Sequence, residues 1–162
     1  MFQRVGRFSI APVHGPSVIY SIPLALIKAA ASGSATGIPD RSEYGSPEDI
    51  PVDKLLKFIV QEHEAERAGK HYDYRIETEG GNLLSWASRK DLPPPGKKRL
   101  WIGQPIHEGA YADFTGEIVS GYGKGIVKKK EEGRVIVTRA TPDRIDFVLA
   151  HKKFPETFGL VR

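Results

Sequence analysis

The chain of 162 residues contains no cysteine. This absence excludes disulfide bonds, zinc sites built from thiolates and a cysteine nucleophile. A chain without cysteine also fits a reducing compartment.

Long apolar runs are also missing. The nearest one, Pro16–Ala31, is shorter than a membrane span and is interrupted by Pro23 and Lys28. Arginines precede this run, which gives it some signal-peptide character, but Lys28 breaks the apolar part. We therefore expect a cytoplasmic protein without a membrane-spanning segment.

Neither sign of charge dominates. The chain carries 24 Lys and Arg residues against 20 Asp and Glu residues, so its formal net charge is +4. An excess of this size is compatible with a polyanionic partner such as nucleic acid. It is equally compatible with a slightly basic cytosolic protein that has no such partner.

Strand-like alternation is largely absent from the first 52 residues. They are rich in Ser, Pro, Gly and Ala, and Ser32–Pro51 has the composition of a linker. The segment Ile22–Ala31 could form one short helix, with Pro23 tolerated in its first turn. We predict an irregular N-terminal extension over residues 1–52 and one domain over residues 53–162.

From residue 53 onward, short strand-like segments alternate with turns. The segments His71–Glu77 and Asn82–Ala87 flank a Glu-Gly-Gly turn, which predicts a hairpin. Similar segments are Lys57–His63, Arg99–Ile106, Thr115–Val119, Gly125–Lys129, Arg134–Arg139, Arg144–Ala150 and Phe158–Arg162. Many short strands at this spacing predict a mostly β sandwich or barrel.

The most informative segment is HYDYR, which begins at His71. In a β-strand, His71, Asp73 and Arg75 share one face, and Tyr72 and Tyr74 share the other. Imidazole and carboxylate groups are metal ligands, and a guanidinium binds phosphate. The alternative is an ordinary amphipathic strand whose polar side faces water.

Two further histidines could complete a metal site. His63 ends the preceding strand-like segment, and His107 begins HEGAYADF, with Tyr111 four residues later. Two histidines and an aspartate from separate strands suit manganese, iron or zinc. Lys90 and Arg99 could bind a phosphate. Isolated histidines are more often structural and exposed cations are more often solvated, so spacing alone leaves both interpretations open.

Eight segments resemble, in order, the 3′-phosphoesterase domain of the bacterial end-joining DNA ligase D. The segments run from about Phe58 to Arg162 and are FIVQEHEA, HYDYRIE, LLSWASRK, KRL, the His107–Tyr111 pair, YADFTGEI, GYGKG and FGLVR. One such segment is weak evidence, whereas eight in the same order are specific. The chain is similar to free-standing members of this family.

The resemblance implies a compact antiparallel β-barrel with a polar active-site pocket. It also implies a divalent-metal-dependent enzyme, preferring manganese (Mn2+), that trims DNA 3′ ends. Such an enzyme removes a 3′-terminal ribonucleotide or a 3′-phosphate and leaves a 3′-hydroxyl for repair and end joining. Position by position, the resemblance implies metal ligands at His63, Asp73 and His107, and catalytic residues at His71, Arg75, Lys90, Arg99 and Tyr111.

The sequence departs from the family in three places. The loop Glu64–Lys70, between His63 and His71, is longer than in many members. An arginine, Arg89, precedes Lys90 where the family commonly has a proline. This difference affects the direction in which the Lys90 side chain points. The N-terminal part also lacks a clear match to the arginine and acidic residues that the family carries there. One alternative is therefore a catalytically weak DNA-end-binding module on the same fold. Another is a metal-binding β-barrel that acts on a small molecule.

Partners follow from the same resemblance. We expect the chain to bind DNA or DNA/RNA 3′ ends in a primer-template. We expect any ligase or polymerase to act in trans, the protein to be a monomer, and no membrane to be involved.

Overall fold

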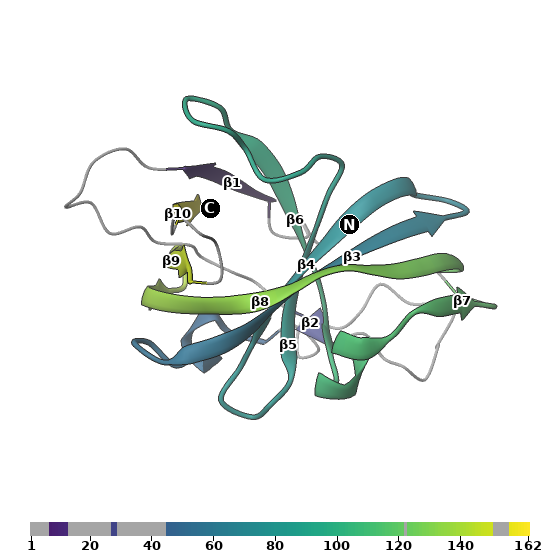
Figure 1. Ribbon diagram of the computed structural model, residues 1–162, viewed down its shortest axis with the longest axis horizontal. Helices are drawn as coiled ribbons and strands as arrows, with labels where there is room; N and C mark the ends of the chain where they lie inside the picture. Colours follow the sequence, from purple (N-terminus) through teal and green to yellow (C-terminus); the bar gives the residue numbers. More distant parts are fainter. Residues whose placement is uncertain (1–6, 13–26, 29–44, 122, 151–155) are drawn as a thin grey trace, which may run out of the picture.

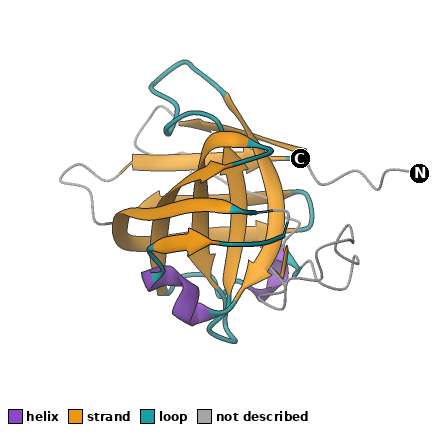
Figure 2. Cartoon of the chain, turned by 90° about the vertical axis from the view of Figure 1, so that its right-hand side faces the viewer, coloured by secondary structure: helices purple, strands orange, loops and turns teal. Residues whose placement is uncertain are grey.

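Strands make up nearly all the regular structure in the part of the chain that the computed structural model describes (Figure 2). That part comprises residues 7–12, 27–28, 45–121, 123–150 and 156–162. Its elements are β1 (Arg7–Pro12), β2 (Ile27–Lys28), the 3-10 helix η2 (Pro47–Asp49), β3 (Leu55–Ala65), β4 (Gly69–Glu77), β5 (Leu83–Ser88), β6 (Arg99–His107), the 3-10 helix η3 (Gly109–Asp113), β7 (Gly116–Ile118), β8 (Gly125–Thr141), β9 (Arg144–Leu149) and β10 (Glu156–Val161).

The sheet closes on itself. Its strands follow the order β1-β10-β9-β8-β3-β4-β5-β6, and β1 also pairs with β6, which completes a ring (Figure 1). The pairings around the ring are antiparallel. β7 adds to β8 outside this order, and β2 lies parallel to β6. The predicted mostly β, antiparallel fold is confirmed in this form.

A hydrophobic core fills the inside of the ring. Each strand of the ring contributes side chains to it, and the larger ones include Phe8, Phe58, Tyr74, Trp86, Trp101, Phe147 and Phe158. Tyr74 stacks on Trp101 with their ring centroids 4.3 Å apart. Because successive side chains of a strand point to opposite faces, the residues that alternate with this core lie on the face turned away from it.

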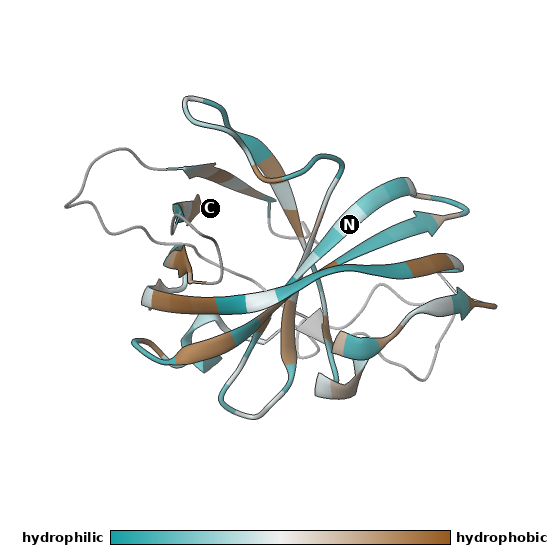
Figure 3. Cartoon of the chain, viewed as in Figure 1, coloured by the Kyte–Doolittle hydropathy of each residue, from teal (hydrophilic) through white to brown (hydrophobic). Residues whose placement is uncertain are grey.

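Strand β3 carries the chain from the core to a polar region. Figure 3 shows it hydrophobic over its first half and hydrophilic toward its end. Its register against β8 shifts between Val60 and Gln61, so that Val60 lies opposite Glu131 and Gln61 opposite Lys129. Such a bulge bends a strand and increases its twist. The bend comes immediately before Gln61 and His63, two polar residues that are nevertheless buried.

Two expectations about residues 1–52 need correction. Arg7–Pro12 is strand β1, not an irregular segment, because it pairs with both β6 and β10 and buries Phe8. Ile27–Lys28, expected in a helix, is strand β2, which continues the edge of β6 beyond the part that β1 covers. The rest of the expected helix lies outside the described residues, and the boundary at residue 52 stays a prediction.

The two strands predicted at Gly125–Lys129 and Arg134–Arg139 are one strand, β8. The charged stretch between them pairs with β3 in place of forming a turn. In the described part of the chain, no helix is long and apolar enough to cross a membrane.

Candidate active site

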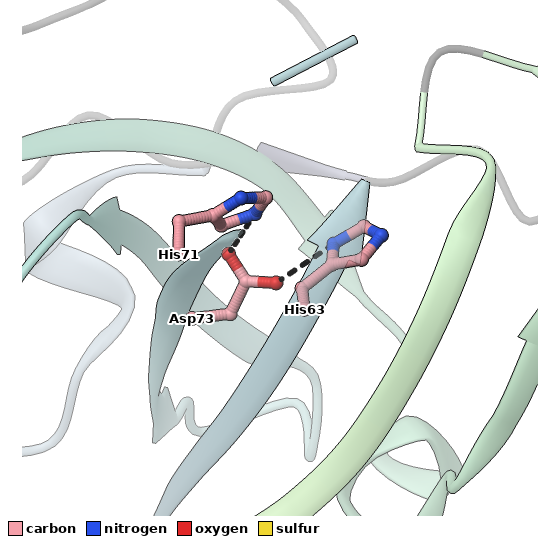
Figure 4. A group of neighbouring side chains, drawn as sticks. All are labelled: His63, His71 and Asp73. Atoms are coloured by element: carbon pink, nitrogen blue, oxygen red, sulfur yellow. Dashed lines mark ion pairs between the residues drawn. The ribbon is translucent and has the colours of Figure 1, made fainter. Parts of the chain in front are cut away.

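Three potential metal ligands meet on neighbouring strands. In the β3–β4 pairing, His63 lies directly opposite His71, and Asp73 follows two residues later on the same face of β4. One ligand atom from each side chain lies within 4.8 Å of the others (Figure 4). Hairpin register therefore assembles this triad, on the face of the sheet turned away from the core.

Both imidazoles of the triad are oriented by main-chain carbonyl groups. Nε2 of His63 lies 2.7 Å from the carbonyl oxygen of Gly123, and Nδ1 of His71 lies 2.9 Å from that of Gly69. A carbonyl oxygen only accepts hydrogen bonds, so these two ring nitrogens carry the protons. In the neutral rings, the lone pairs are then on Nδ1 of His63 and Nε2 of His71.

Those two lone pairs both face the carboxylate of Asp73. Nδ1 of His63 lies 3.4 Å from Oδ2, and Nε2 of His71 lies 3.4 Å from Oδ1. A charge-assisted hydrogen bond is shorter, about 2.7–2.9 Å. Two ligands that share an ion with bonds of about 2.1 Å lie roughly 3.0–3.4 Å apart. The nitrogen and oxygen donors, their spacing and the carbonyl groups behind them fit a divalent cation.

The charges of the triad support one another. Burial alone raises the pKa of Asp73. Without a metal ion, His63 and His71 donate hydrogen bonds to this carboxylate when their rings are protonated, and together with the charge of Arg75 they hold its pKa far below the usual range. Burial lowers the pKa of His71, yet the hydrogen bond that its protonated ring donates to Asp73 and the charge of that carboxylate raise it above the ordinary value. The site therefore keeps an ionised carboxylate between two imidazoles.

Arg75 is buried beneath the triad, and its side chain is 2% exposed. Its Nε donates to Oε1 of Gln61 at 2.6 Å, and Nη1 donates to Oγ of Ser85 at 2.6 Å and to Nδ1 of His107 at 2.8 Å. Nη2 lies 3.4 Å from Oδ2 of Asp73. Most N–H groups of the Arg75 guanidinium thus form hydrogen bonds with neighbouring side chains of the site.

His107 differs from the other two site histidines in the nitrogen that it exposes. Since a guanidinium only donates, its hydrogen bond from Arg75 requires an unprotonated Nδ1. The proton of the neutral ring is then on Nε2. Burial and the charge of Arg75 keep the pKa of His107 well below its ordinary value. Tyr111 packs on the imidazole, with ring centroids 4.5 Å apart, and also lies beneath the Arg75 guanidinium.

A pocket of about 620 Å³ opens above the triad. Among the described residues, Asp73 is the single acidic residue in its lining, whereas four cations contribute to it. These cations are Arg89, Lys90, Lys98 and Arg99. An excess of positive charge around one carboxylate favours a phosphate or another anionic ligand.

The structure brings the predicted site residues together. His63, His71, Asp73 and His107 line the pocket, with Lys90 and Arg99 at its edge. Arg75 lies beneath them, and Tyr111 packs on its guanidinium. His71 joins His63 and Asp73 in the triad, whereas His107 bonds Arg75. The individual roles of these residues stay predictions.

Three further residues of the site escaped the sequence analysis. Gln61 holds Arg75 and also donates from Nε2 to the carbonyl oxygens of Tyr111 and Phe114. Ser85 accepts from Arg75. Both lie on the face of His63 and Asp73, so the alternation along the two strands could have identified them. The role of the Gly123 carbonyl has no such signal.

Comparison with known proteins gives two matches. Residues 61–162 match the family described as the DNA Ligase D 3′-phosphoesterase domain, so the resemblance seen in the sequence is confirmed. The multifunctional non-homologous end joining protein LigD of Pseudomonas aeruginosa is 45% identical over 75 residues. That alignment covers 45% of this chain and 9% of the relative, so the chain spans a small part of that protein.

Proposed function

Because the chain belongs to the family of DNA ligase D 3′-phosphoesterase domains, we propose that it is a divalent-metal-dependent phosphoesterase that processes DNA 3′ ends. It removes a 3′-phosphate, a 3′-terminal ribonucleotide or both, and leaves a 3′-hydroxyl for repair and end joining. The observation that carries this proposal is the pair of carbonyl-oriented imidazoles that aim their lone pairs at one buried carboxylate.

His63, His71 and Asp73 are the residues that would hold the metal, with manganese the expected ion. A bound divalent cation would supply Lewis-acid polarisation of a phosphoryl oxygen. This assignment exchanges two roles implied by the sequence resemblance, because His71 takes the ligand position that was expected for His107. The hydrogen bonds of the two rings support the exchange, since His71 presents a lone pair and His107 an N–H group.

The remaining residues act on the phosphate. His107 donates from Nε2 to a phosphoryl oxygen, and its lowered pKa keeps it a neutral donor. Lys90 and Arg99 place positive charge near the oxygens that gain charge in the transition state. Arg75 holds Asp73 and His107 in position. Tyr111 supports the ring of His107 from the side.

The substrate and partners follow from the same proposal. DNA or DNA/RNA 3′ ends in a primer-template are the substrate, and a ligase or polymerase acts on the resulting 3′-hydroxyl. The protein works as a monomer in the cytoplasm.

The experiment that tests this function uses a labelled primer-template in two forms, one ending in a 3′-phosphate and the other in a single 3′-ribonucleotide. Each is incubated with the protein and Mn2+, with and without a chelator, beside an Asp73→Ala variant. Conversion to a 3′-hydroxyl that requires both metal and Asp73 supports the proposal. Retained binding without conversion of either substrate supports a DNA-end-binding module and overturns the enzymatic assignment.

A further inference from the structure

Arg89 lies beside the triad on the side away from Arg75. In the antiparallel β4–β5 ladder, Ser88 pairs with Tyr72. Arg89 is the next residue after Ser88, and it therefore lies at the level of His71. Its Nη1 is 3.7 Å from the position that a Cβ atom on Gly69 would occupy. Gly69 is the residue whose carbonyl oxygen orients His71. The guanidinium therefore stands next to a proposed ligand, at the edge of the pocket.

Within the described residues, no acidic side chain pairs with Arg89. In the described part of the chain, its exposed side chain makes no hydrogen bond and no ion pair. Cations on the adjoining surface differ in this respect, since Lys70 pairs with Glu62 at 3.1 Å and Lys130 with Asp91 at 2.8 Å. A free guanidinium at the edge of a pocket with a single buried carboxylate is available to an anion from outside.

The pocket is larger than one phosphate group requires. Its volume of about 620 Å³ lies within the range of sites that hold a drug-sized ligand. An apolar floor leads away from the triad, because Ala87 lies opposite Asp73, and Ile102 lies opposite Ala87. Leu100, 46% exposed, extends this floor. A phosphate at the triad thus leaves room for a sugar and for the next unit of a strand.

We propose that Arg89 binds the internucleotide phosphate next to the scissile one, and so makes this site select the end of a nucleic-acid strand over a mononucleotide. The proposal rests on the proposed function, since it assumes that the scissile phosphate lies at the triad. Arg89 is then a specificity-determining residue. It contributes to binding of the strand and leaves the chemical step to the residues beneath the pocket.

The test compares Arg89→Gln with the wild type and with Arg67→Gln. Arg67 is an exposed arginine of the neighbouring β3–β4 turn that does not line the pocket, so its variant loses the same charge. Two substrates are used with Mn2+, an oligonucleotide ending in a 3′-phosphate and a nucleoside 3′-monophosphate, which has no second phosphate. Fluorescence anisotropy with a labelled 3′-hydroxyl oligonucleotide, over a range of salt concentrations, measures binding without turnover.

We expect Arg89→Gln to raise KM for the oligonucleotide about tenfold, the loss of one charge-assisted contact, with kcat nearly unchanged. The nucleoside monophosphate should be processed as by the wild type. Oligonucleotide affinity should fall by a similar factor, and its salt slope should decrease by about 0.7. Arg67→Gln should match the wild type in each measurement.

Three results would overturn the proposal: equal losses on both substrates, equal losses in the two variants, or an unchanged affinity in Arg89→Gln. Failure of the proposed function has a different signature. In that case the wild type converts neither substrate, while the anisotropy comparison of the two variants still decides whether Arg89 binds the strand.

Discussion

Nη1 of the buried Arg75 donates a hydrogen bond to Nδ1 of the half-buried His107 across 2.8 Å. Because the guanidinium stays protonated, it fixes His107 in the tautomer that carries its proton on Nε2. His63 and His71 are fixed in the opposite sense, since main-chain carbonyl groups take their N–H protons and leave lone pairs toward Asp73. In the proposed function, these hydrogen-bond partners assign His63 and His71 to metal binding and His107 to donation.

This division predicts different effects of two histidine substitutions. His71→Ala removes a ligand, so its affinity for Mn2+ should fall by about 100-fold or more. His107→Ala should keep that affinity within about threefold but lower kcat by about 100-fold, the cost of losing one donor to a developing oxyanion. Isothermal titration with Mn2+ and single-turnover kinetics measure the two effects. Strong loss of Mn2+ binding in His107→Ala would instead indicate that His107 is a metal ligand, as the sequence resemblance implied.

The fork of Arg75 predicts that lysine cannot replace it. An ammonium group cannot reach Gln61, Ser85, His107 and Asp73 together, so Arg75→Lys leaves buried acceptors unpaired. The free energy of unfolding should fall by roughly 3 kcal/mol. Urea denaturation of the metal-free protein measures it. The matched control, Arg89→Lys, changes an exposed arginine and should alter stability by less than about 0.5 kcal/mol. Equal stability of the two variants would contradict a structural role for Arg75.

Alternation was enough to predict the polar face of β4, because a period of two places His71, Asp73 and Arg75 together whatever the rest of the fold does. It could not reveal which two histidines join Asp73 in the triad. That depends on carbonyl groups in two turns, and the turn at Gly69 has a positive φ of 73° that no hydrophobic pattern encodes.

Strand β1 was missed for a different reason. Its sequence, RFSIAP, alternates polar and apolar residues over only four positions and lies among Pro, Gly and Ser residues. It is a strand because β6 and β10 both present backbone groups to it, which is a tertiary effect that propensity does not describe. The same reason applies to Ile27–Lys28, which pairs with the exposed edge of β6.

Gln61 joins the core strand β3 to the segment that carries Tyr111. Its Nε2 donates to the carbonyl oxygens of Tyr111 and Phe114 at 2.9 and 3.1 Å, while its Oε1 accepts from Arg75. Gln61→Leu should lower the free energy of unfolding by roughly 2–4 kcal/mol. The substitution removes the hydrogen-bond partner of the two carbonyl oxygens and of the Arg75 guanidinium, and leaves these buried polar groups unpaired. Urea denaturation measures the loss. The control Gln104→Leu removes one 3.4 Å hydrogen bond to Ile102 and should cost under about 1 kcal/mol. Similar losses in both variants would argue against Gln61 as the link.

Asp146 predicts how the stability of the protein depends on pH. Burial raises the pKa of its carboxyl to about 7, although the charges of Arg144 and Arg139 act in the opposite direction. In the unfolded chain this pKa is about 3.9. The folded state therefore binds the proton more tightly, and its free energy of unfolding falls as pH rises from about 4 to 7.

Asp146→Asn should remove that dependence, because an amide stays neutral across the range. The variant should resemble the wild type near pH 4 and be the more stable of the two at pH 8, by roughly 1–3 kcal/mol. Thermal unfolding at pH 5, 6, 7 and 8 measures the difference. Asp113→Asn is the control, since the hydrogen bond and charge of Lys129 lower the pKa of that exposed carboxyl, which then stays ionised above pH 5. A stability difference between wild type and Asp146→Asn that does not grow with pH would show that Asp146 is ionised in the folded protein throughout this range.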